Sequence, residues 1–213
     1  MVTSGLERGH DWKDGFLFIG NHLTLDLLNT RPIQNGEPQE LLPDFKALLR
    51  WFRAAELLNT REFATLQRKW ESSARARVLL EKIRRLREDI REEVLSWEAG
   101  GKVHRAAIEK LNRLLAAHPM QTKIVATARG LRVIPCFEAH EPGDLLSPLA
   151  HSAARLFTEA DHTRVRKCSH CVLHFLDTSK KGTRRWCSMQ LCGNRLKVAA
   201  YAARQRSREK RNF

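Results

Sequence analysis

Apolar residues recur every three or four positions along most of the chain, which is the spacing of one face of an α-helix. The pattern is strongest over residues 76–99, where charged side chains occupy the opposite face and Gly100 and Gly101 then end the predicted helix. The apolar face of this helix consists of Leu79, Ile83, Leu86, Ile90, Val94 and Trp97.

Weaker versions of the same spacing predict several shorter helices. Asn21 and Asp44 stand where N-cap residues of two of them would stand, because short polar side chains accept hydrogen bonds from the first turn. The predicted segments are 22–30, 44–58 (burying Phe45, Leu48, Leu49 and Phe52), 60–72, 102–117 and a helix after Pro148.

The period changes between residues 122 and 137, where two β-branched runs flank Arg129 and Gly130 and predict a β-hairpin. Residues 31–43 are rich in Pro, Gly and Asn and are predicted to form a loop. Together these elements predict a mainly α protein. Residues 1–162 would form a helical domain with one β-hairpin, and residues 163–213 a second, small module.

Charge is distributed unevenly between these two parts. The formal net charge is +14, and residues 164–213 carry fourteen Lys or Arg against two Asp or Glu, so that +12 of it lies in the last fifty residues. Such asymmetry favours a polyanionic partner, most often nucleic acid. The alternative is a cationic tail that only keeps the protein in solution.

Four of the five cysteines lie in the basic segment, as Cys168-x2-Cys171 and Cys187-x4-Cys192. The chain begins without the basic-then-apolar pattern of a secretory signal and has no apolar run long enough to cross a bilayer. A cytoplasmic location is therefore expected, and there disulfides are rare. Four thiolates at this spacing predict one tetrahedral Zn²⁺, with redox-active or unrelated thiols as the alternative.

A site with four protein ligands leaves no position for water or substrate, so the predicted zinc is structural. The second cysteine pair lies where an extended segment meets a helix that Ser188 could cap, as in a treble-clef or zinc-ribbon finger. His170 and His174 are nearby substitute ligands. Cys136, on the predicted hairpin, is expected to be a small buried residue instead.

The segment 168–197, CSHCVLHFLDTSKKGTRRWCSMQLCGNRLK, resembles the CGNR zinc finger, named for the tetrapeptide at 192–195. The segment LTLDLLNT at 23–30 resembles the opening motif of the ABATE domain, which accompanies this finger. Members of that family are described as stress-induced transcription regulators or RNA-binding zinc-ribbon-like proteins. The resemblance implies that the four cysteines hold the metal and that the helix after them belongs to a nucleic-acid-binding module.

The residues after Ser188 are predicted to continue as a basic helix to about Arg206. One stripe of this helix is apolar, and a second carries cations with one aromatic residue, which suits contacts to phosphates and stacking. An exposed helix with no partner is the alternative. The predicted contacts, from this stripe and from the segment between the cysteine pairs, are Lys180, Lys181, Arg184, Arg185, Arg195, Lys197, Tyr201, Arg204 and Arg208.

Residues next to the predicted metal have structural alternatives. Arg195 could read guanine or could pair with Asp177, and Asn194 is expected to bond neighbouring loop carbonyls. Phe175 and Trp186 are predicted to form the small apolar core of the finger.

Three polar residues, Asp26, Asn29 and Thr30, lie about one turn apart on the first predicted helix. On an otherwise apolar helix they indicate an internal hydrogen-bond network or, alternatively, contacts to a ligand. The sequence names no effector.

An enzyme is not expected, because the chain shows no phosphate-binding glycine loop, no nucleophile elbow and no open metal site. The favoured function is a transcription regulator that binds nucleic acid, DNA in preference to RNA, without a membrane partner. The alternatives are a zinc-stabilised adaptor for protein partners and an RNA-binding zinc-ribbon protein. Homodimerisation stays open.

Overall fold

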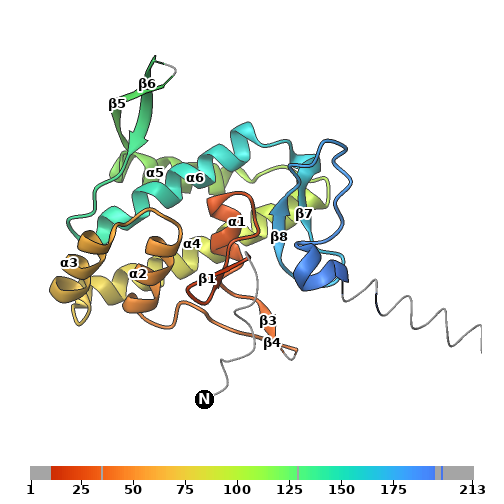
Figure 1. Ribbon diagram of the computed structural model, residues 1–213, viewed down its shortest axis with the longest axis horizontal. Coiled ribbons are helices and arrows are strands. Elements are labelled where there is room, and N and C mark those ends of the chain that lie inside the picture. Colours follow the sequence, from red (N-terminus) through yellow and green to blue (C-terminus); the bar gives the residue numbers. More distant parts are fainter. Residues whose placement is uncertain (1–10, 35, 129, 195–197, 199–213) are drawn as a thin grey trace, which may run out of the picture.

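The computed structural model of the chain describes residues 11–34, 36–128, 130–194 and 198. Six α-helices pack around a continuous apolar core in this part of the chain (Figure 1). Their bounds are α1 Leu23–Leu28, α2 Phe45–Ala54, α3 Thr60–Trp70, α4 Ala74–Glu98, α5 Arg105–Ala117 and α6 Leu146–Glu159.

Helix α4 is the longest and runs through the body of the molecule, with contacts to α1, α2 and α5 (Figure 1). Its buried face contains the predicted Leu79, Ile83, Leu86, Ile90 and Val94. Two charged residues are buried with them, Arg87 at 1% exposure and Glu93 at 8%, although the pattern placed charges on the outer face.

Helix α2 confirms its predicted cap, because the Asp44 carboxylate accepts a hydrogen bond of 2.7 Å from the backbone N–H of Ala47. The predicted cap of α1 is wrong. His22 is the N-cap, and Asn21 instead adopts a positive φ of 55° and donates its side-chain N–H to the carbonyl of Leu176. Asn is one of the residues that tolerate this conformation, so the same side-chain chemistry serves a turn instead of a cap.

The described strands form four two-stranded antiparallel sheets, three of them before residue 160, where the sequence predicted one hairpin. The predicted hairpin is confirmed as β5 Gln121–Thr127 and β6 Gly130–Cys136, and it projects from the helices (Figure 1). The others have strands of two or three residues, too short for an alternating pattern. They are β1 Trp12–Lys13 with β2 Phe16–Leu17, β3 Ile33–Gln34 with β4 Glu37–Pro38, and β7 Val165–Lys167 with β8 His174–Leu176.

Of the C-terminal described elements, β8 lies against α1 and β7 against α4, and a π-helical turn over Met189–Gly193 follows them (Figure 1). We call residues 165–194 the finger module. Within the described ranges, no helix combines the length and the apolar composition needed to span a membrane.

Candidate metal centre and nucleic-acid interface

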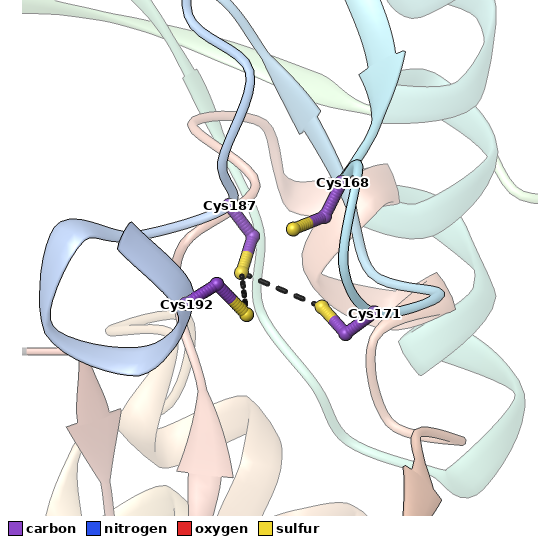
Figure 2. Close-up of side chains that lie close together, drawn as sticks. All are labelled: Cys168, Cys171, Cys187 and Cys192. Carbon is purple, nitrogen blue, oxygen red and sulfur yellow. Dashed lines mark hydrogen bonds between the residues drawn. The ribbon is translucent and has the colours of Figure 1, made fainter. Parts of the chain in front are cut away.

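The four predicted cysteines converge on one point of the finger module (Figure 2). Cys168 follows β7, and Cys171 lies in the turn before β8. Cys187 precedes the π-helical turn, and Cys192 lies within it. Their sulfur atoms all lie within 4.8 Å of one another, and Cys187 Sγ lies 3.6 Å from both Cys171 Sγ and Cys192 Sγ.

This spacing fits a zinc ion. Four sulfurs at Zn–S distances of about 2.3 Å in a tetrahedron are about 3.8 Å apart, close to the distances seen. The thiols also perturb one another: hydrogen bonds from Cys171 and Cys187 lower the pKa of Cys168, and sharing a proton with Cys168 raises the pKa of Cys171 to about 12. A dication removes this conflict because it stabilises all four thiolates together.

Short local contacts hold the ligands in place. The N–H of Cys168 donates to the carbonyl of Leu173 at 2.9 Å and closes the turn between the first two cysteines. Ser188 caps the π-helical turn, as predicted, by accepting from the N–H groups of Gln190 and Leu191. The N–H of Cys192 then donates to the carbonyl of Ser188, which fixes the fourth sulfur.

The apolar core of the finger module is completed from the other end of the chain. Phe175 is fully buried and Trp186 partly buried, which confirms both as core residues. The same cluster contains Leu17 and Ile19 of the N-terminal segment at 4% exposure each. The Ser188 hydroxyl also hydrogen-bonds Asp11. The finger module is therefore packed against residues 11–20.

Asn29 joins α1 to the finger module. Its amide is buried and makes two hydrogen bonds of 2.9 Å to His174, accepting from the backbone N–H and donating to the carbonyl. Beside it, the N–H of Leu176 donates to the carbonyl of Gly20 at 2.8 Å. Strand β8 is thus paired on its free edge by the side chains of Asn21 and Asn29 and by the backbone carbonyl of Gly20.

Thr30 and Asp26 also have internal partners. Thr30 Oγ1 donates to the carbonyl of Leu27 and accepts from Arg87, which in turn makes a two-point ion pair with Glu40 at 2.8 and 2.5 Å. Asp26 accepts from the N–H of Gly20 at 2.7 Å. Asp26, Asn29 and Thr30 therefore hold three different parts of the chain, as expected of structural hydrogen bonds.

Burial raises the pKa of Asp26 to about 7, although the N–H groups of Gly20 and Ile19 act in the opposite direction. Because the folded pKa lies above the unfolded value of 3.8, the associated stability is complete below pH 3.8 and is lost as the pH rises through 7. Because the wild type loses this stability and the neutral amide does not titrate, we expect the free energy of unfolding of Asp26→Asn to rise relative to that of the wild type by about 2–3 kcal/mol between pH 5 and pH 8. Urea unfolding of both zinc-loaded proteins measures it, and a constant difference would contradict the assignment.

Arg184 was predicted to contact nucleic acid, but its guanidinium is occupied inside the finger module. It donates to the carbonyls of Trp186 and Cys187 and lies 4.5 Å above the ring of Phe175. Two arginines that the prediction did not single out act similarly. Arg164 donates to the carbonyls of Asp177 and Ser179, and Arg166 donates to that of Gly182 at 2.7 Å. These three arginines stiffen the loop between the cysteine pairs.

Lys180, Lys181 and Arg185 are exposed on that loop, as a binding role requires. Lys167 was not among the predicted contacts, but it is also exposed and lines a cleft of about 560 Å³ with Arg166, Arg184 and Arg185. Its position at the end of β7, next to the first ligand, was the available signal. Five predicted contacts lie outside the described residues: Arg195, Lys197, Tyr201, Arg204 and Arg208.

The other residues considered near the metal have structural roles or lie outside the sulfur cluster. Both Asp177 carboxylate oxygens accept hydrogen bonds, from the N–H groups of Ser179 and Arg184, so this side chain organises the loop. Asn194 is exposed and ends the π-helical turn. Among the described residues the cluster that could hold a metal consists of the four cysteines and includes neither Cys136 nor a histidine.

Four clustered sulfurs on a capped turn and a short hairpin define a zinc finger, and its closed site holds one structural zinc. Residues 164–205 match the CGNR zinc finger, and residues 21–160 match the ABATE family, whose description is "Putative stress-induced transcription regulator". The second match covers more than half of the chain, which therefore belongs to the ABATE family. No curated protein matches the chain significantly.

Proposed function

We propose that the protein is a non-enzymatic transcription regulator of the cytoplasm that binds nucleic acid, DNA in preference to RNA, through the finger module. The observation that carries this proposal is a set of exposed cations, Lys167 at the end of β7 and Lys180, Lys181 and Arg185 on the loop between the cysteine pairs, a loop held in place by hydrogen bonds from Arg164 and Arg166. A fixed array of cations suits phosphates, because little conformational entropy is lost on binding. We also infer a treble-clef arrangement that continues into a basic helix.

The preference for DNA follows from the predicted basic helix, since a helix fits the major groove of duplex DNA but not the deep, narrow groove of duplex RNA. The closed zinc site supports a scaffold role for the metal, because four protein ligands leave no place for a reacting group. The family description supports a regulator as well.

Salt titration of binding to a labelled duplex tests the proposal. With six to eight phosphate contacts, the logarithm of the affinity should fall with the logarithm of salt at a slope of about −5 to −7. Lys180→Ala with Lys181→Ala should make this slope shallower by about 2. Lys46→Ala with Lys82→Ala removes the same charge from exposed positions on α2 and α4 and should leave the slope unchanged.

A salt-independent affinity, or equal slopes for the two double variants, would contradict the proposed interface. Tighter binding of single-stranded RNA in the same titration would transfer the function to the RNA-binding alternative. Absence of any shift with DNA or RNA at low salt would favour the adaptor for protein partners.

A further inference from the structure

An apolar cavity of about 210 Å³ lies between α4, α5 and α6, away from the zinc site. Its walls are formed by one face of each helix. Its lining includes the polar side chains of Asp89, Glu93, Lys110, Asn112 and Thr158, of which Lys110 pairs with Asp89 and Glu93 accepts from the N–H of His104. The apolar lining comprises Leu86, Ile90, Val103, Ala107, Ile108, Leu111, Leu115, Ala154 and Phe157.

Helix α5 forms one wall without being buried itself. None of its thirteen residues, all of which the structure describes, is buried, and Ile108 is 47% exposed. The facing residues of α4 are well covered, Leu86 at 5% and Ile90 at 4% exposure. An amphipathic helix normally buries its apolar stripe. The stripe of α5 instead borders the cavity, so that a molecule bound there would complete its burial.

The size and lining of the cavity restrict its ligand. An apolar cavity of about 150 Å³ is enough to bind benzene, so this one has room for a six-membered ring with a small substituent. A charged ligand would have to leave water for an apolar surface at a high energetic cost. One polar substituent can be met near Thr158, whose hydroxyl donates to the carbonyl of Ala154 and keeps acceptor capacity.

We propose that this cavity binds an uncharged aromatic or alicyclic small molecule carrying one hydrogen-bonding substituent. The site is distinct from Asp26, Asn29 and Thr30, whose side chains hold parts of the chain together. It gives the helical domain a binding function that the zinc finger does not supply.

The cavity is connected to the finger module through α4. The ring of Phe157 packs edge-on against Trp97 at 5.5 Å between centroids, and Trp97 stacks on His162. One residue further, the Glu98 carboxylate lies 3.5 Å from His174 Nε2 in β8. A ligand that moves Phe157 therefore changes the surroundings of Trp97. A regulatory role for the cavity rests on the function proposed above. The binding of a small molecule in the cavity does not depend on that function.

The test is calorimetric titration of the zinc-loaded full chain with indole, phenol and cyclohexanol, without nucleic acid. We expect at least one of them to bind with a dissociation constant below about 1 mM, and benzoate and benzylammonium to bind at least tenfold more weakly. Ala107→Leu and Ala154→Leu, which fill the cavity from opposite walls, should each weaken binding at least tenfold. Ala106→Leu, on the exposed side of α5, is the matched control and should bind as the wild type.

Trp97 fluorescence gives a second readout, since the signal change on binding should disappear in Trp97→Phe while the calorimetric affinity stays within threefold. Failure of all three neutral compounds to bind below 1 mM would overturn the proposal. It would also be overturned if both cavity-filling variants retained wild-type affinity or if the charged compounds bound equally well. These titrations contain no nucleic acid, so they test ligand binding even if the protein does not bind DNA.

Discussion

Cys168→Ser is expected to abolish stoichiometric zinc binding and to unfold the finger module. The binding free energy of a structural zinc, about 10–16 kcal/mol in small fingers, is largely folding free energy, so losing one thiolate ligand should cost several kcal/mol. The loss should reach beyond the finger module, because its core contains Leu17 and Ile19. Metal analysis together with amide exchange of residues 11–30 measures both effects.

Cys136→Ser is the matched control for this experiment. Cys136 is half-buried at the end of β6 and lies outside the sulfur cluster, so its replacement should leave the metal content at one zinc per chain. A Cys168→Ser protein that retains one zinc and wild-type exchange protection would refute the four-cysteine site. Removal of zinc from the wild type with a chelator should reproduce the loss of protection.

Arg87→Ala is expected to lower the free energy of unfolding by about 3–5 kcal/mol. The side chain of Arg87 is only 2% exposed and pairs with Glu40 at two points while donating to Thr30. Removing one partner of a buried ion pair is strongly destabilising. Without Arg87, the Glu40 carboxylate would keep the N–H of Leu42 and the more distant Arg84, 3.8 Å away, but would lose its two hydrogen bonds to the guanidinium. The ion pair also explains why the pKa of Glu40 is lowered although burial acts to raise it.

Arg105→Ala provides the comparison, because Arg105 is 92% exposed and pairs with Glu109 one turn away on α5. Such exposed pairs contribute about 0.3–0.5 kcal/mol, so this variant should be nearly neutral. Chemical unfolding of the two variants separates buried from exposed pairing. Equal costs would mean that Arg87 contributes no more than a surface charge.

The sequence predicted the parts of the fold in which one pattern extends over many residues. The apolar period of α4, the Asp44 cap and the hairpin around Gly130 all rest on local chemistry, and the structure confirms them. The zinc ligands could be predicted equally well, because the spacing of the cysteines in the sequence constrains the positions of their sulfur atoms directly.

Features that depend on partners elsewhere in the chain could not be predicted from the sequence in the same way. The burial of Arg87 depends on Glu40, which comes from a loop 47 positions earlier in the chain. The internal role of Arg184 depends on the ring of Phe175 in β8 as well as on the nearby carbonyls of Trp186 and Cys187. No local pattern marks Leu17 and Ile19 as residues of the finger core, since they are apolar in either environment.

The packing of residues 11–20 against the finger module has a consequence for the order of synthesis. These residues are synthesised before their partners Leu176 and Ser188, which lie more than 150 positions further along the chain. Until then Leu17 and Ile19 have no core to enter, and the amide of Asn29 lacks the backbone that it later binds. Capture of the metal thus completes the packing of residues 11–20 and of the finger module together, so a shortage of zinc is expected to leave both segments unfolded.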